Sequence, residues 1–157
     1  MRGEVTKKRV EKSQVASEGV KKKKDQKAKE RIAVLDLRNR SGAKDSEVLY
    51  LTSLLRQAAS RLPTSRFSVM TKNNILVLLP PNTKLEDCVG TCAVDTGRRI
   101  GAQWILVGEV VRFGSSLRVV LNLHHSKSGE LRGSETVKGE SLEKLEGPLQ
   151  GTALGLF

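Results

Sequence analysis

The spacing of apolar and polar residues predicts a strand followed by an amphipathic helix early in the folded part of the chain. The stretch RIAVLDLRN (Arg31–Asn39) is a nearly continuous apolar run, which is typical of a strand covered on both faces. Between Glu47 and Leu62 apolar residues recur at helical spacing, which places Arg56 and Arg61 on the solvent side. Pro63 follows and marks the end of this helix.

The middle of the chain predicts one more strand and two helical segments. FSVMT (Phe67–Thr71) has the composition of a short strand, and NNILVLL (Asn73–Leu79) predicts a helix that ends before two prolines. Either Thr71 or Asn73 can cap that helix. The segment Leu85–Gly101 is interrupted by glycine, and we expect it to end as a helix with Gly101 as its stop.

The last third predicts an antiparallel meander. WILVGEVVRFG (Trp104–Gly114) is the clearest strand in the sequence, and SLRVVLNLHH (Ser116–His125) alternates apolar and polar residues. LRGSETVKG (Leu131–Gly139) is more polar, which favours an edge strand. From Ser141 the chain has a helical pattern, which we expect to break at Gly147–Pro148.

The order of elements predicts an α/β fold with a mixed sheet of about five strands. One parallel β-α-β crossover precedes the antiparallel meander, and the helices pack on the sheet. The length of 157 residues fits one domain with a tail. We therefore assign residues 31–157 to the α/β domain.

The first thirty residues differ from the rest in composition. They hold 11 Lys or Arg against 5 Asp or Glu, and they contain no aromatic residue, leucine or isoleucine. Such a segment cannot bury enough apolar area to offset its conformational entropy, which predicts a disordered basic arm over residues 1–30. The cluster Lys21, Lys22, Lys23 and Lys24 is a possible site for nucleic acid or another anionic surface, with weak and salt-dependent affinity.

No targeting or membrane-spanning pattern is visible. The basic arm is not followed by an apolar stretch before Ile32, and no apolar run is long enough for a membrane span. As written, the sequence predicts a cytoplasmic product. An in-frame leader upstream of the assigned start would place it in the periplasm or envelope instead.

The two cysteines, Cys88 and Cys92, leave three interpretations open. On a regular helix their Cβ atoms would be ~5–6 Å apart, which would strain a disulfide. Gly90 lies between them and favours a bend that would bring the sulfurs together. Two buried thiols, a disulfide and a metal site are therefore all compatible with the spacing, although a zinc site would need His124 or His125 as further ligands.

Other candidates for chemistry are weak. His124 and His125 close a strand, where exposed or edge histidines are the ordinary case. Asp36 and Asp45 flank a strand-to-helix loop, where α/β proteins often bind small ligands, but NRSGAKD has neither phosphate-binding glycine pattern. The sequence shows no catalytic constellation and predicts no enzyme, cofactor, metal or small-molecule substrate.

The order and spacing of several motifs resemble the amino-terminal domain of TolB and its relatives, which include FlgO-type and CsgG-type envelope proteins. The resemblance covers about residues 31–145 and rests on RIAVLDL, FSVMT, the core RIGAQWILVGEV (Arg99–Val110), and the later His125 and Ser128–Leu131. The paired cysteines before AVDTGRRIGA resemble a variant found in delta-proteobacterial proteins.

The resemblance implies a non-catalytic module that binds another protein or helps to assemble envelope complexes. The predicted edge strand and the loop after the first strand are the natural contact sites. On the edge strand, the candidate interaction residues are Arg132, Ser134, Thr136 and Lys138.

Overall fold

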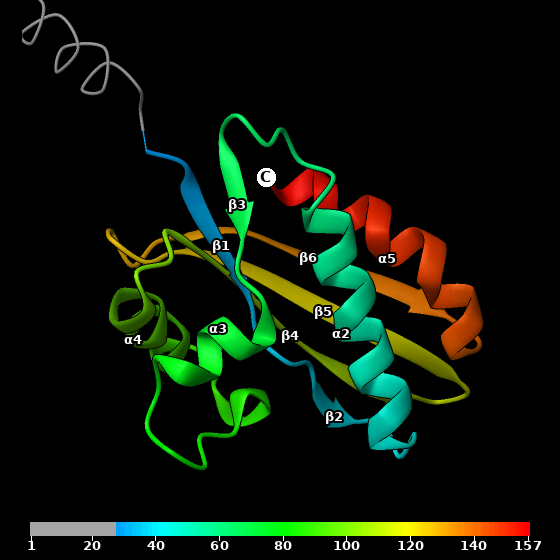
Figure 1. The fold of residues 1–157 in the computed structure, drawn as a ribbon. Helices are drawn as coiled ribbons and strands as arrows, with labels where there is room; N and C mark the ends of the chain where they lie inside the picture. The colour runs from blue at the N-terminus through cyan, green and yellow to red at the C-terminus, as the bar shows by residue number, and fades with distance from the viewer. Residues whose placement is uncertain (1–27) are drawn as a thin grey trace, which may run out of the picture.

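The structure of the protein is a computed structural model that describes residues 28–157 (Figure 1). Its strands are β1 (Glu30–Val34), β2 (Arg38–Arg40), β3 (Phe67–Val69), β4 (Trp104–Phe113), β5 (Ser116–His125) and β6 (Leu131–Gly139). Its helices are α2 (Asp45–Ala59), α3 (Lys72–Val77), the 3-10 turn η1 (Leu85–Asp87), α4 (Thr91–Ile100) and α5 (Leu142–Leu156).

These strands form one mixed sheet in the order β3-β1-β4-β5-β6, and β2 also pairs with β4. β1 is parallel to both β3 and β4, whereas β4, β5 and β6 are antiparallel neighbours. The predicted α/β class, the mixed sheet and the meander are confirmed. The structure adds a second parallel pairing, between β1 and β4, and the short strand β2.

The predicted strand Arg31–Asn39 is divided into β1 and β2 by a short irregular segment. The backbone N–H of Leu37 donates to the hydroxyl of Thr52 in α2 at 3.0 Å, so at this point the chain bonds to a helix. Pairing with β4 resumes at Arg38, which lies opposite Glu109. The interruption therefore follows from a buried hydroxyl, which an apolar pattern does not reveal.

Helices α2 and α5 lie side by side across one face of the sheet, which we call the α2 face (Figure 1). Alternation along β5 points Leu117, Val119, Leu121 and Leu123 to this face, and all four are buried. They join the apolar stripe of α2 and the inner side of α5 in one core. The predicted alternation of β5 is confirmed.

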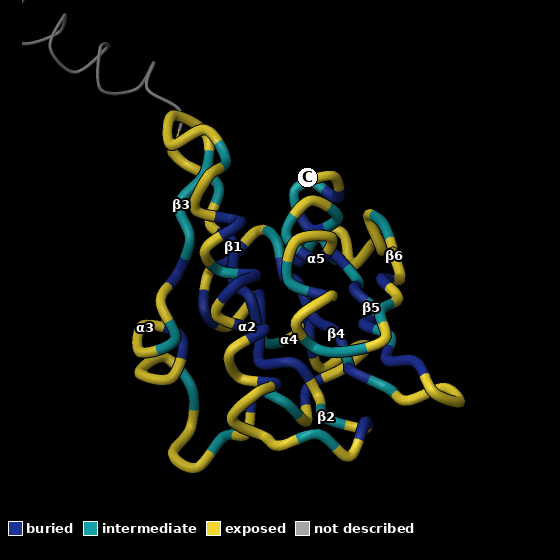
Figure 2. The backbone as a smooth tube through the Cα atoms, turned by 90° about the vertical axis from the view of Figure 1, so that its right-hand side faces the viewer, coloured by how far each residue is buried: buried dark blue, intermediate teal, exposed yellow. Residues whose placement is uncertain are grey.

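The opposite face, which we call the α4 face, is covered only in part. Helices α3 and α4 and the turn η1 bury a smaller core there: Ala33, Leu35, Met70, Ile75, Leu85, Cys88, Ala93, Ile100, Ala102, Ile105 and Val107. Beyond Val107, Glu109 on β4 and Val120 on β5 are half-buried on this face, and Thr136 on β6 is exposed. Figure 2 shows the contrast between buried β1 and largely exposed α3.

Helix α5 corrects the predicted break at Gly147–Pro148. It runs from Leu142 to Leu156 with Pro148 inside it, although proline removes one helical hydrogen bond. Leu145, Leu149 and Ala153 are buried against the sheet and α2. Packing of this apolar stripe outweighs the local cost of proline.

The predicted helix ends near the sheet are confirmed. Gly101 ends α4 in the left-handed region, with φ of 74°. Thr71 caps α3, and its hydroxyl accepts from the backbone N–H of Asn74. Each of these ends lies close to a strand. Trp104 begins β4 three residues after Gly101, and Thr71 follows the end of β3 at Val69 by two residues.

Residues 1–27 of the predicted basic arm lie outside the described residues. β1 begins at Glu30, one residue before the predicted start of the domain. Among the helices of residues 28–157, none combines the length and the apolar character that crossing a bilayer would require.

Candidate interaction surface

β6 is an edge of the sheet, and part of its backbone is free to pair with another strand. The Leu106 carbonyl of β4 accepts from the Leu35 N–H on the β1 side, whereas the His125 N–H of β5 donates to the carbonyl of Glu130, the residue before β6. Backbone groups alternate in direction along a strand, so the odd residues of β5 bond to the odd residues of β6. The N–H and C=O groups of Ser134, Thr136 and Lys138 therefore point away from the sheet.

Three of the four predicted edge residues share one side of β6. Ser134, Thr136 and Lys138 are exposed on the α4 face. Arg132 lies apart, because Leu123 is opposite Gly133 while His124 is opposite Leu131, which leaves Arg132 as the extra residue of a bulge. Its guanidinium carbon lies 5.9 Å from the centre of the Trp104 ring. The free edge is thus shorter than the predicted one.

Charged and aromatic groups on the α4 face continue this surface away from the edge. Phe113 is 66% exposed, and the Arg118 guanidinium lies 4.5 Å from the centre of its ring. Arg40 and Glu109 form an ion pair at 3.6 Å. Burial lowers the pKa of His124 on the same face, since a half-buried imidazolium loses hydration.

The loop after β1 carries a buried ion cluster. Asp36 is 5% exposed and accepts from Arg56 of α2 at 2.9 Å and from Lys72 of α3 at 2.9 Å. Arg56 also donates to the Val34 carbonyl at 2.8 Å, so the prediction that Arg56 lies on the solvent side is wrong. The reason is that a buried carboxylate at the end of β1 needs a cation as its partner.

The sequence contains one signal for this cluster. Val48, Thr52 and Arg56 follow one another at intervals of four residues, so they line up on α2 beside its apolar stripe. Thr52 and Arg56 both bond to the segment between β1 and β2. The sequence gives no comparable signal for Lys72. This residue comes close to Asp36 because β3, which precedes α3, pairs in parallel with β1.

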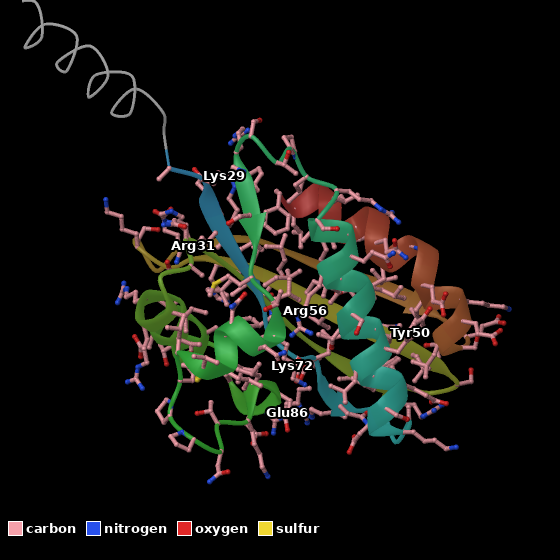
Figure 3. All side chains as sticks on the ribbon, in the orientation of Figure 1. Lys29, Arg31, Tyr50, Arg56, Lys72 and Glu86 are labelled. Carbon is pink, nitrogen blue, oxygen red and sulfur yellow. A yellow bond between two sulfur atoms is a disulfide. The ribbon has the colours of Figure 1, made fainter. Side chains whose placement is uncertain are left out.

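An open hollow of about 390 Å³ adjoins the cluster at the carboxyl end of β1. Lys72 of α3 and Glu86 of η1, which are labelled in Figure 3, are among the residues that line it. Its lining includes Asp36, Asn39, Asp45, Lys72, Glu86 and Asp87. The predicted candidates Asp36 and Asp45 thus line one hollow. Asp45 accepts from the Asn39 side-chain amide at 2.8 Å, which orders the loop between β2 and α2.

Cys88 and Cys92 are joined by a disulfide in the structure. Gly90 between them has φ of 63°, and the two Cα atoms are 5.2 Å apart. Cys88 is buried in the core of the α4 face, whereas Cys92 is exposed. The bend at Gly90 removes the regular-helix geometry that would have strained the bond.

The two adjacent histidines point to opposite faces. The His125 ring packs edge-on against Trp104 with ring centres 4.7 Å apart, and its Nδ1 lies 3.0 Å from the Ser128 hydroxyl. Trp104 in turn donates from Nε1 to Glu30 at 2.6 Å. Over residues 28–157, no three His, Cys, Asp or Glu side chains are grouped as metal ligands. Lys21–Lys24 lie outside the described residues.

Comparison with known proteins finds solved structures with a similar fold. No family model and no curated protein matches the chain. The LpoB C-terminal domain from Salmonella enterica matches with a TM-score of 0.57 and 19% identity, over 73% of this chain and 84% of that one. Lipoprotein GNA1162 from Neisseria meningitidis matches with a TM-score of 0.52 and 17% identity, over 80% of this chain and 92% of that one.

TolB from Acinetobacter baumannii also matches, with a TM-score of 0.53 and 14% identity. The match covers 81% of this chain but only 27% of that structure, so the likeness concerns one part of TolB. The predicted relation to FlgO-type and CsgG-type proteins, and to a delta-proteobacterial variant, stays a prediction. The chain is therefore similar in fold to the LpoB C-terminal domain, to part of TolB and to a lipoprotein.

Proposed function

We propose that this protein is a non-catalytic interaction module of a bacterial envelope assembly, which binds another protein by strand addition at β6. The observation that carries the proposal is the free edge itself. Ser134, Thr136 and Lys138 present outward backbone groups and exposed side chains on one side. An added strand would gain main-chain hydrogen bonds from this edge and contacts to alternate side chains.

The fold likeness supports the envelope part of the proposal. The similar structures include a lipoprotein and TolB, and the sequence motifs resemble the TolB amino-terminal domain. The α4 face beside the edge supplies the means of specificity. Phe113 and Arg118 offer an aromatic and a charged contact there, and both residue types are enriched in protein interfaces.

The test is a proline substitution at the edge with a matched control. Thr136→Pro removes an outward N–H and leaves the bonds between β6 and β5 in place, while Thr136→Ala removes the side chain and keeps the N–H. We expect crosslinked capture of the partner from envelope extract to be lost with Thr136→Pro and kept with Thr136→Ala. Equal capture by both variants, with both folded by circular dichroism, would contradict strand addition.

A second function rests on the lysine cluster Lys21–Lys24. Clustered lysines bind nucleic acid or anionic surfaces through displacement of counterions, and the affinity falls steeply with salt. The full chain and a shortened chain that starts at Glu30 are compared for DNA binding over a salt titration. We expect only the full chain to bind. Equal binding by both chains would reject this second function.

A further inference from the structure

The sheet has a second free edge, at β3. The Arg66 carbonyl accepts from Glu30 and the Met70 N–H donates to Ile32, so these groups of the β3 segment point toward β1. Alternation then directs the N–H and C=O of Val69 away from the sheet. β3 lies at the end of the strand order, opposite β6.

A groove of about 400 Å³ runs beside this edge on the α4 face. Its lining comprises Arg31, Ser68, Val69, Met70, Asn74, Val77 and Leu78. Val77 is 81% exposed and Leu78 is 49% exposed, which makes the α3 wall of the groove strongly apolar. Consecutive exposed apolar residues of this kind are typical of a contact surface.

The lining of the groove also includes one positively charged side chain, that of Arg31. Arg31 is the second residue of β1, and it lies away from Arg56 and Lys72 (Figure 3). Its backbone is held by Gln103, whose side chain accepts from the Arg31 N–H at 2.6 Å and whose N–H donates to the Arg31 carbonyl. None of the ion pairs between residues 28 and 157 involves Arg31. Its guanidinium is therefore available for a carboxylate.

We propose that an extended segment of a partner protein, with an apolar residue followed by a carboxylate, binds in this groove. The segment adds to β3 through the outward backbone groups of Val69. Its apolar side chain packs against Val77 and Leu78, and its carboxylate pairs with Arg31. This binding is strand addition at β3 instead of β6. The bound segment must carry a negative charge, because Arg31 gives the groove a positive one.

The test measures fluorescence anisotropy of labelled octapeptides on the full chain. The main probe alternates valine and threonine and ends in glutamate with an amidated terminus. A second probe has glutamine and a free terminal carboxylate, and a third has neither charge. We expect saturable binding of at least one charged probe below about 1 mM, and the probe that binds identifies the source of the carboxylate.

Substitutions then locate the bound peptide. Val77→Glu and Arg31→Gln are each expected to weaken binding by about tenfold or more. Val89→Glu is the matched control, because Val89 is also exposed (43%) but does not line the groove, and its binding should not change. No saturable binding at about 1 mM, or equal weakening by Val89→Glu, would overturn the proposal.

Amide hydrogen exchange separates this site from the β6 edge. Peptide binding is expected to slow exchange at Val69 and to leave Thr136 unchanged. If Thr136 slows and Val69 does not, the groove proposal is wrong and the proposed role of β6 gains support. The two sites therefore succeed or fail independently.

Discussion

The two faces of one sheet differ in how completely they are covered, and the difference is clearest at neighbouring residues of β5. Leu121 is fully buried under the helices of the α2 face. Val120 is half-buried on the α4 face, next to Thr136 of the edge strand. A single strand thus contributes to the core with one side and to the surface with the other.

This asymmetry separates stability from recognition. The α2 face contains the larger core, in which α2 and α5 pack together over four strands. The α4 face ends its core at Val107 and leaves groups such as Phe113 of β4 exposed. Substitutions on the α2 face should therefore change folding, while those on the α4 face should change binding.

The sharpest test of this comparison is a pair of truncations on β5. Leu121→Ala removes fully buried side-chain volume and should lower the free energy of unfolding by about 2–5 kcal/mol. Val120→Ala should lower it by about 1 kcal/mol or less, because its side chain is already partly in water. Urea denaturation of both variants measures the difference. Equal losses would show that the α4 face is as closely packed as the α2 face.

Asp36 links the helices of the two faces, because Arg56 belongs to α2 and Lys72 to α3. Asp36→Asn leaves the half-buried Arg56 without a counter-charge and should lower the free energy of unfolding by about 3 kcal/mol. Lys72→Gln should cost about 1 kcal/mol or less, since its side chain is 42% exposed. Urea denaturation again measures both. A larger loss from Lys72→Gln than from Asp36→Asn would contradict this account.

The disulfide lies on the α4 face, where Cys88 belongs to the core. It closes a loop of five residues, so reduction should lower the free energy of unfolding by about 2 kcal/mol in the chain-entropy account. Hydrogen exchange in α4 should quicken after reduction, whereas exchange in α5 should quicken less. Cys92→Ser serves as the control that lacks the bond without a reductant. Uniform quickening in both helices would show that the bond acts only through the unfolded chain and not by restraining local opening of the α4 face.

Much of the fold followed from the sequence because the apolar pattern is strong where one face is buried. β5 has strict alternation, and Gly101 gives α4 a sharp end. The division between β1 and β2 did not follow, because it depends on a bond between Leu37 and the Thr52 hydroxyl. The sequence also did not reveal that α5 is continuous, since the packing of this helix outweighs the local effect of Pro148.

The candidate surfaces were only partly predictable for a related reason. An edge strand shows in its polar composition, so Thr136 and its neighbours could be chosen from the sequence. The bulge at Arg132 depends on register, which composition does not encode. The β3 groove depends on which strand lies last in the sheet, because only that position frees the backbone of Val69.

The smallest expected effect concerns two adjacent histidines that face opposite sides of the sheet. Burial lowers the pKa of His124 below its ordinary value of 6.5, so the folded state takes up this proton less readily than the unfolded state. The contribution of His124 to stability is complete above pH 6.5 and declines as the pH falls through that value. His124→Gln should flatten this decline between pH 7 and 5.

His125→Gln is the matched control, because His125 packs against Trp104 on the α2 face. Its urea midpoint should fall through lost contact between the His125 ring and Trp104, which gives the structural cost of removing an imidazole at this end of β5. Urea midpoints measured across the same pH range for both variants decide the point. If the decline of the midpoint with falling pH persists in His124→Gln, the acid sensitivity does not arise from His124, and burial of its imidazole does not set the pH dependence of stability.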